Sequence, residues 1–152
     1  MLHVAAQGDQ PASLAYFLLL GIDINSRDSR LSTPLHWAAF AGADLALTFI
    51  LAQGAEVNLQ DLKGLTPVHL AVRTSEEIQT TRSIRALLLK GANPLLKNDL
   101  GQLPQDYLLD FKLEVPGMQE MTDEIRNLLN PDQSMLTKDC ECFALKVQYR
   151  KR

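Results

Sequence analysis

Thr33-Pro34-Leu35-His36-Trp37-Ala38-Ala39 is the stretch of sequence that decides the fold. It recurs as Thr66-Pro67-Val68-His69-Leu70-Ala71-Val72, and its second half recurs near the start as Leu2-His3-Val4-Ala5-Ala6. The three histidines are therefore spaced by 33 residues and then by 33 again. A motif that returns at a fixed period of this size predicts a stack of repeated structural units.

Each residue type in the motif suits the start of a helix. The threonine hydroxyl can accept a hydrogen bond from the first free backbone amides of the helix. The proline that follows lacks an N–H group, which costs nothing at the first helical position. The leucine and the alanine pair then face inward, where small alanine side chains let neighbouring helices approach closely. Each unit is therefore expected to begin with a helix at its Thr-Pro pair.

Three histidines in one chain raise a metal-binding hypothesis. One histidine per unit places them on successive layers, and packed helices lie about 8–10 Å apart. Zinc–nitrogen bonds are only about 2 Å long, so one ion cannot reach all three. We therefore expect no metal site, and we expect His3, His36 and His69 to be hydrogen-bonding residues that connect one repeat to the next.

Composition limits the classes of function that fit this chain. It has 152 residues, of which 46% are hydrophobic, and its net charge of -3 gives no bias toward nucleic acid. Two cysteines make no disulfide framework, which favours a reducing environment. The apolar runs are far shorter than the span of about 20 residues that a bilayer needs, and the start does not read as a signal peptide. We find no phosphate loop or nucleophile elbow, so we expect no enzymatic activity, no cofactor and no small-molecule substrate.

The Thr-Pro-Leu-His-x-Ala motif and its period resemble those of the ankyrin-repeat family. The resemblance implies an all-α solenoid of about four stacked helix-turn-helix units with projecting β-hairpin turns. We expect this domain to cover residues 1–130, and we expect residues 131–152 to form a flexible tail. The predicted repeats are 1–27, 28–60, 61–97 and 98–130. Their predicted second helices are 13–20, 44–53 and 81–90, and the last helix is 119–130.

Departures from the repeat pattern carry further predictions. Leu31 stands where the next units have Gly64 and Gly101, so we expect its turn to be distorted or longer. Four extra residues lie within 73–82, and we place them between the two helices of the third unit or in an extended first turn of its second helix. The fourth unit has lost the Leu-His pair, as expected of a terminal cap with a more polar outer face. Because the chain begins inside the motif, we also expect it to be a fragment or its true start to lie upstream.

The resemblance implies a binding groove between the turn tips and the first helices, occupied by a protein or an extended peptide. The positions that match it are Arg30, Trp37, Phe40, Lys63, Leu65, Leu70 and Arg73, in a wider set with Ser29, Ser32 and Leu62. Trp37 is the leading contact candidate, because Trp and Arg are enriched among residues that dominate binding energy. The alternative is that Trp37 fills a gap against Phe40 and Leu70. The sequence leaves both interpretations open.

A narrower resemblance is to the cytosolic ankyrin domain of Asp-His-His-Cys palmitoyltransferases. It rests on the Leu-His-Val-Ala-Ala-Gln-Gly-Asp opening, the Thr-Pro-Leu-His-Trp-Ala motif and a basic tail that contains Cys140 and Cys142. It implies an alternative function, in which the chain is the substrate-recruiting part of a membrane-bound protein S-palmitoyltransferase. The Asp-His-His-Cys motif itself is absent from this chain.

The two cysteines of the tail admit more than one interpretation. Cys140 and Cys142 are candidates for lipidation, because a lipid together with a basic patch can anchor a chain to a membrane. The alternative is that they are ordinary tail residues. We expect membrane contact only through such a lipidated segment or a missing C-terminal one. The expected location is the cytoplasm, or the cytosolic face of a membrane if the chain is part of a larger protein.

Overall fold

The computed structural model describes residues 1–108 and 118–130 of the chain. Within these residues the chain forms seven α-helices and one short 3₁₀ helix, and none of them lies in a β-strand. The elements are α1 (Leu2–Gln7), α2 (Pro11–Leu19), α3 (Pro34–Ala41), α4 (Asp44–Ala52), α5 (Pro67–Ile78), α6 (Arg82–Leu89), η1 (Pro104–Leu108) and α7 (Met118–Leu129). The predicted all-α architecture is confirmed.

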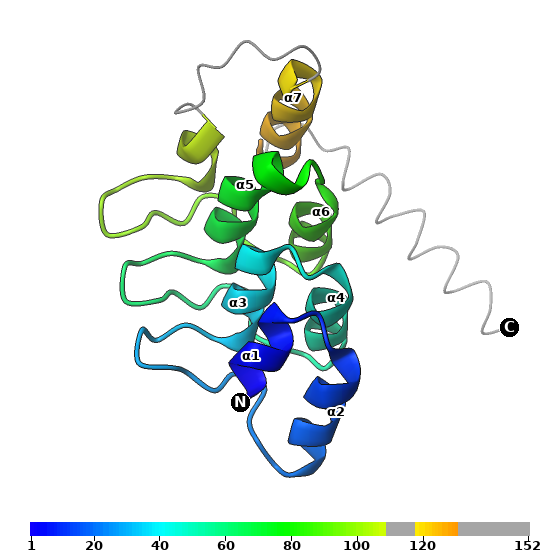
Figure 1. The fold of residues 1–152 in the computed structure, drawn as a ribbon. Coiled ribbons are helices and arrows are strands. Elements are labelled where there is room, and N and C mark those ends of the chain that lie inside the picture. Colours follow the sequence, from blue (N-terminus) through cyan, green and yellow to red (C-terminus); the bar gives the residue numbers. More distant parts are fainter. Residues whose placement is uncertain (109–117, 131–152) are drawn as a thin grey trace, which may run out of the picture.

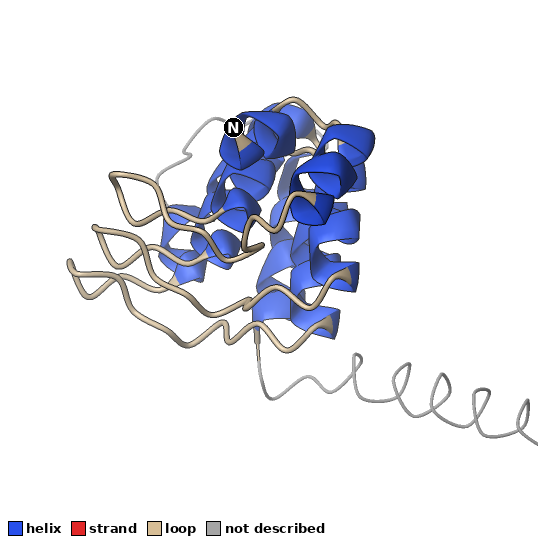
Figure 2. Ribbon diagram, turned by 90° about the horizontal axis from the view of Figure 1, so that it is seen from below, coloured by secondary structure: helices blue, strands red, loops and turns tan. Residues whose placement is uncertain are grey.

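The helices stack in two layers. Figure 1 shows α1, α3 and α5 in one layer and α2, α4 and α6 in the other, with the turns projecting to one side. The view from below in Figure 2 shows the two rows of helices side by side, with the projecting loops extending to the left. Along the first layer α1 packs on α3, α3 on α5, and α5 on η1. This repetition is what the 33-residue period predicts.

One continuous apolar core runs between the layers from Leu2 to Leu129. Its large, fully buried apolar side chains come from every unit, and they are Leu2, Leu14, Leu35, Leu47, Ile50, Val68, Val72, Ile84, Leu87 and Ile125. Alanines at the equivalent positions of α1, α3 and α5 are also buried, which allows these helices to approach closely. The core therefore joins all units into one stack.

The projecting turns are shaped by side-chain hydrogen bonds and do not form strand ladders. In the first turn, Asp28 Oδ1 accepts hydrogen bonds from the backbone N–H groups of Arg30 and Ser32, at 2.8 and 2.9 Å. Neighbouring turns are also joined directly, because the N–H group of Leu62 donates to the carbonyl of Arg30 at 2.9 Å. The β-hairpins implied by the family resemblance are thus hairpin-shaped turns in the described residues.

The turn at Leu31 corrects one prediction. Leu31 adopts a left-handed backbone conformation with φ of +58°, close to the +71° of Gly64. Its N–H group lies 2.9 Å from the carbonyl of Asp28, and that of Gly64 lies 3.0 Å from the carbonyl of Asp61. The expectation of a distorted or longer turn is therefore wrong, because a leucine accepts the strained conformation and the turn keeps its length.

The four inserted residues of the third unit correct a second prediction. They lengthen the first helix, because α5 has 12 residues where α3 has 8. Thr74 Oγ1 lies 3.0 Å from the carbonyl of Leu70 and 3.2 Å from that of Ala39 in α3, so the extra turn is tied to the preceding unit. The side chain of Ile78 fills the space where a Cβ on Gly42 would lie. The insertion therefore lies neither in the loop nor in the second helix.

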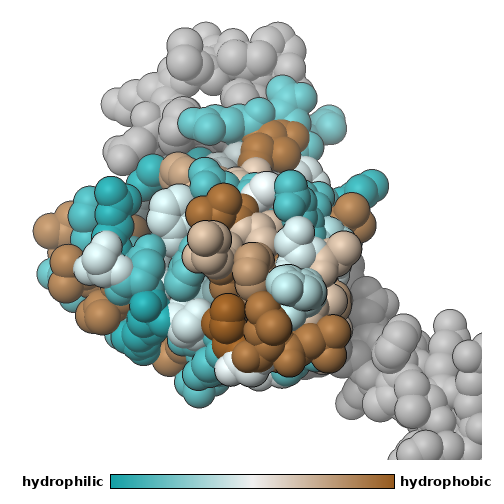
Figure 3. Space-filling view, turned by 60° about the horizontal axis from the view of Figure 1, so that its bottom comes forward, coloured by the Kyte–Doolittle hydropathy of each residue, from teal (hydrophilic) through white to brown (hydrophobic). Residues whose placement is uncertain are grey.

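The N-terminal end of the stack presents an apolar face. Figure 3 shows hydrophobic side chains gathered at this end of the molecule. Val4 in α1 and Tyr16, Leu19 and Leu20 around α2 are all exposed. Nothing among the described residues covers this face.

Candidate functional site

His36 and His69 connect each unit to the next. Nε2 of His36 lies 3.0 Å from the carbonyl oxygen of Leu65, while Nδ1 accepts the backbone N–H of Thr33 at 3.1 Å. Because Nδ1 is an acceptor, the ring proton lies on Nε2, which donates to the carbonyl. His69 repeats the arrangement, with the carbonyl of Gln102 at 3.3 Å. The prediction that these histidines tie the repeats together is confirmed.

The environment of the two rings keeps them neutral. Burial lowers the pKa of His36 and of His69, against an opposing effect of the carbonyl hydrogen bonds and of Asp61. Both rings are therefore unprotonated near neutral pH. His3 forms the corresponding link in the first unit, with Nε2 at 3.1 Å from the carbonyl of Ser26 and 3.0 Å from that of Ser32. In residues 1–108 and 118–130 no group of His, Cys, Asp or Glu side chains could hold a metal ion.

The fourth unit keeps only half of this arrangement. Asp106 stands at the histidine position, and its Oδ2 accepts the backbone N–H of Leu103 at 2.7 Å. The carboxylate thus replaces Nδ1 in capping the short helix η1, but it has no proton to donate to a following unit. The fourth unit therefore caps its own short helix without offering a hydrogen bond to a further unit, as expected of a terminal unit.

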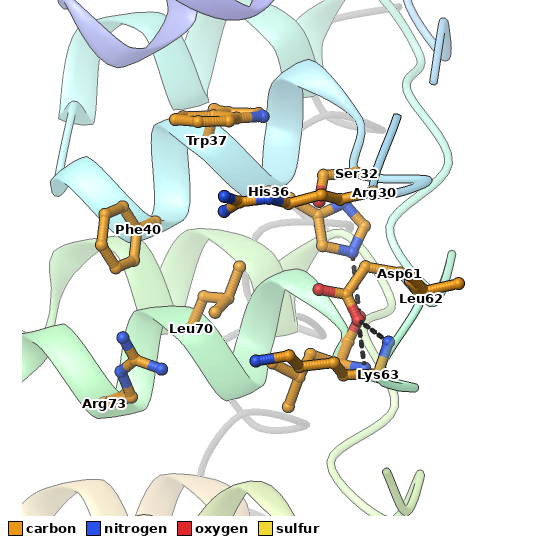
Figure 4. A pocket seen from close by; sticks show the side chains of 11 residues that line it. Arg30, Ser32, His36, Trp37, Phe40, Asp61, Leu62, Lys63, Leu70 and Arg73 are labelled. Atoms are coloured by element: carbon orange, nitrogen blue, oxygen red, sulfur yellow. Dashed lines mark hydrogen bonds between the residues drawn. The ribbon is translucent and has the colours of Figure 1, made fainter. Parts of the chain in front are cut away.

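A groove of about 510 Å³ lies across α3, α5 and the first two projecting turns. All seven predicted partner-binding residues line it, together with Ser32 and Leu62 of the wider set; Ser29 does not. Figure 4 shows these side chains converging on one space from helix and turn positions more than 30 residues apart. The lining residues are Arg30, Ser32, His36, Trp37, Phe40, Asp61, Leu62, Lys63, Leu65, Leu70 and Arg73. That these residues bind a partner stays a prediction.

Trp37 is held in place at one wall of the groove. It is half-buried against the core, and its Nε1–H donates to Asp28 Oδ2 at 2.9 Å. Partial burial alone raises the pKa of Asp28, but hydrogen bonds from Trp37 and from the backbone of Ser32 and Arg30 outweigh it and lower the pKa. The anionic Asp28 therefore anchors the indole. The two interpretations of Trp37 are compatible, since one ring both packs and lines the groove.

Phe40 and Arg73 form the second wall. The guanidinium of Arg73 lies over the Phe40 ring, 5.5 Å from its centroid, which is a cation–π geometry. Phe40 is 40% exposed, so part of this residue remains accessible to a partner. Leu65 and Leu70 are buried beneath and form an apolar floor.

Two lining residues, His36 and Asp61, were not predicted as part of the groove. Asp61 Oδ1 accepts the N–H groups of Lys63 and Leu65 at 2.8 and 2.9 Å, as Asp28 does in the preceding turn. The signal in the sequence is the recurrence of an Asp or Asn five residues before the Thr-Pro pair. Asn98 continues it in the fourth unit, with Oδ1 at 2.9 Å from the N–H of Gln102.

Other predicted features lie outside the described residues. They include Cys140, Cys142 and the tail 131–152, so lipidation stays a prediction. No helix within the described ranges is both long enough and apolar enough to cross a bilayer.

Comparison with protein families gives a match over most of the described helices. The family described as "Ankyrin repeats (3 copies)" matches residues 2–99, which is more than half of the chain. No curated protein matches the sequence, and the narrower resemblance to palmitoyltransferases stays a prediction. The matched region contains the three complete helix pairs and ends before η1 and α7. This chain belongs to the ankyrin-repeat family.

Proposed function

We propose that this chain is a non-catalytic module that binds an extended polypeptide segment in the groove across α3 and α5. Ankyrin repeats generally mediate protein–protein interactions, which supports a protein partner. The observation that carries the proposal is the groove itself, where Trp37 and Phe40 present aromatic surface beside exposed Arg30 and Lys63. Aromatic residues and arginine are the types enriched in protein interfaces.

The composition of the groove fits a protein interface. Its floor is apolar, with Leu65 and Leu70, while its rim carries the exposed charged side chains of Arg30 and Lys63. An apolar centre surrounded by a polar rim is the usual anatomy of such interfaces. The groove therefore offers both a desolvated anchor site and hydrogen-bonding edges.

The groove is also ordered before any partner arrives. Trp37 is anchored on Asp28, and Arg73 lies against Phe40. The first turn is joined to the second by the hydrogen bond from Leu62 to Arg30. A preformed surface loses little conformational entropy on association, so more of the contact energy appears as affinity.

A selection from a random peptide display library against the full chain tests the proposal. Peptides recovered with the native chain are then measured against Phe40→Ala and Arg73→Ala, with Arg82→Ala at the start of α6 as the control. Phe40 and Arg73 are partly or largely exposed, so both variants are expected to keep the native melting temperature within a few degrees. We expect each groove variant to weaken binding about tenfold or more, which corresponds to about 1.4 kcal/mol, and the control to bind normally. Failure to recover peptides, or recovery of peptides that bind all variants equally, would contradict the proposal.

Trp37→Ala separates packing from binding. If Trp37 only packs, the variant loses stability and the folded fraction binds normally. The proposal predicts that the variant loses some stability, because the indole is half-buried and bonded to Asp28. It also predicts weaker binding by the folded fraction. Thermal unfolding and peptide titration of the same sample give both quantities.

A further inference from the structure

We infer that the segment bound in the groove is acidic, with Asp or Glu side chains that pair with Arg30, Lys63 and Arg73. This inference rests on the proposed function, and it adds the charge and the placement of the partner. It rests on three observations: the cationic side chains of the groove, the hydrogen bonds that the nearby carboxylates already accept, and the leucine that replaces a cation in the third turn.

Three cationic side chains from separate elements face the same space. Arg30 lies on the first projecting turn, Lys63 on the second, and Arg73 on α5, and all three are exposed. Figure 4 shows Arg30 and Lys63 extending from the turns toward the helices, and Arg73 on α5 beside Phe40. In residues 1–108 and 118–130 the ion pairs are Arg85–Glu124 and Arg126–Asp123. The three groove cations therefore have no carboxylate partner within the described part of the chain.

Each of the two carboxylates near the groove has at least one oxygen engaged in hydrogen bonds within its own turn. Asp28 accepts hydrogen bonds from Trp37 and from two backbone N–H groups of its own turn. Asp61 uses Oδ1 for the N–H groups of Lys63 and Leu65. Of these two, only Asp61 lines the groove, against three cations. The lining is therefore cationic, although the net charge of the whole chain is -3. An attraction for acidic peptides would come from the groove and not from the overall charge of the protein.

The cationic character stops after the second turn. Arg30, Lys63 and Leu100 occupy the same position in successive turns, each two residues after the Asp or Asn that shapes the turn. The third turn thus presents an exposed leucine, next to the exposed carboxylate of Asp99. Acidic residues of the partner are expected over the first two turns, and apolar or uncharged residues toward the third. This change gives the bound segment a fixed placement along the stack.

Arg73 connects the charged and apolar parts of the groove. Its guanidinium lies over the Phe40 ring and forms no ion pair with a carboxylate of the described residues, so its N–H groups are available to a partner. A carboxylate can accept two of these N–H groups side by side. An apolar partner side chain against the exposed part of Phe40 would then lie next to an acidic one. The geometry favours an acidic segment with an aliphatic or aromatic anchor, and it disfavours a uniformly charged one.

The peptides selected on the full chain test this inference. We expect the groove-dependent peptides, defined as those weakened by Phe40→Ala but not by Arg82→Ala, to be enriched in Asp and Glu. Synthetic copies with Asn and Gln at these positions should bind at least about tenfold more weakly than the acidic peptides. Affinity for the acidic copies should also fall as salt is raised, because exposed charge pairs are screened.

Charge reversal gives the matched control. Arg30→Glu with Lys63→Glu should reverse the preference toward peptides with Lys at the acidic positions, whereas Arg82→Glu should leave the preference unchanged. Both turn-tip side chains are exposed, so circular dichroism and melting curves of the double variant are expected to match the native chain. Trp37 is the only tryptophan, so its fluorescence reports occupation of the groove directly.

The outcomes separate the two proposals. Groove-dependent peptides that are neutral or basic would overturn the acidic inference and leave the proposed function standing. Groove-dependent binding by phosphorylated peptides, with none by their Asp or Glu counterparts, would also overturn it. A selection that yields no groove-dependent peptide would overturn both proposals.

Discussion

At the scale of the residue, His36 illustrates how one side chain serves two levels of structure. Its Nδ1 caps the helix that carries it, and its Nε2 reaches the carbonyl of Leu65 in the following unit. Both contacts need the neutral ring in one tautomer. The motif repeats at this spacing because each unit needs the same pair of contacts.

The neutral histidines make stability depend on pH. His36 and His69 have folded-state pKa values below the ordinary 6.5. As pH falls below about 6.5 the unfolded chain takes up protons that the folded chain does not, so the free energy of unfolding decreases until the lower, folded pKa is passed. The contribution of the rings is fully present above about pH 6.5.

Urea unfolding at about pH 7.5 and about pH 5.5 measures this dependence. At the higher pH, His36→Gln should unfold about 0.5–1.5 kcal/mol more easily than the native chain, because the inter-unit hydrogen bond is weakened. On acidification, the native chain should lose more stability than His36→Gln. The double variant, His36→Gln with His69→Gln, should lose the least stability. Equal losses in all three proteins would contradict the assigned tautomer and burial.

Leu31 offers a stabilising substitution. It holds a φ of +58° that glycine adopts freely and leucine does not. The left-handed conformation costs an ordinary residue about 1–2 kcal/mol, and the greater freedom of glycine in the unfolded chain cancels part of the gain. Leu31→Gly is therefore expected to raise the free energy of unfolding by about 0.5–1 kcal/mol in denaturant titrations. The control is Leu62→Gly, an exposed leucine without positive φ, which should bring no gain.

At the scale of the element, the longer helix α5 changes how the second and third units fit together. Its extra turn places Thr74 against the carbonyl of Ala39 and Ile78 over Gly42. Gly42 has a φ of +64° and ends α3, so the end of one first helix is covered by the end of the next. The insertion thus reinforces the contact between the two units that form the groove.

A double-mutant cycle measures this contact. Gly42→Ala combines the cost of positive φ with a clash against Ile78, whereas Gly54→Ala carries only the φ cost, because nothing lies within 4 Å of its added Cβ. We expect Gly42→Ala to be more destabilising than Gly54→Ala by about 1–3 kcal/mol, the usual range for overpacking. Ile78→Val removes the clashing Cδ1 atom, so this excess should shrink when both glycine substitutions are repeated in the Ile78→Val variant. An excess that is unchanged there would show that Ile78 is not seated on Gly42.

The same element shows where sequence reasoning reached its limit. The period and the Thr-Pro pairs located the starts of α3 and α5 correctly, because capping chemistry is local. The end of α5 is not predicted correctly. The polar run from Thr74 to Glu77 contains neither a proline or glycine that would mark the end of a helix nor a pattern that would predict its continuation. Its helical state depends on contacts with Ala39 and Gly42, which lie more than 30 residues earlier.

The sequence predicts most residues that line the groove, but not the contacts that hold them in place. Arg30, Trp37 and Lys63 occupy equivalent or variable positions of the motif, so the repeat alone brings them together. The anchoring of Trp37 on Asp28 was not anticipated, because it joins a turn to a helix across nine positions without a periodic signal. The fourth unit supplies a related contact, in which Asn98 Nδ2 donates to the hydroxyl of Tyr107 at 3.0 Å.

At the scale of the whole molecule, the stack is held by parallel series of hydrogen bonds as well as by its core. The histidines form one series on the side of the turns. Asparagines form another beneath the second helices, where Asn25 accepts the N–H of Glu56 at 3.0 Å and Asn58 accepts that of Asn93 at 2.7 Å. Each series holds one unit at a fixed position on the next. The width of the groove between the two units is therefore also fixed.

A defined groove with an aromatic wall and uncompensated cations is the central feature of this account. It supports the proposed polypeptide partner because the lining residues lie on two adjacent units, and because Trp37 and Arg73 are held against Asp28 and Phe40. The outer face, formed by α2, α4 and α6, has no comparable set of pinned aromatic and cationic side chains among the described residues. Binding should therefore be confined to the side of α3, α5 and the turns.

The most direct test is the NMR footprint of a selected acidic peptide on the ¹⁵N-labelled chain. The account predicts that shifts concentrate on the Trp37 indole N–H and on the backbone around Arg30, Lys63 and Arg73, while signals of α4 and α6 stay in place. Shifts concentrated on α4 and α6, with the Trp37 indole unchanged, would contradict it.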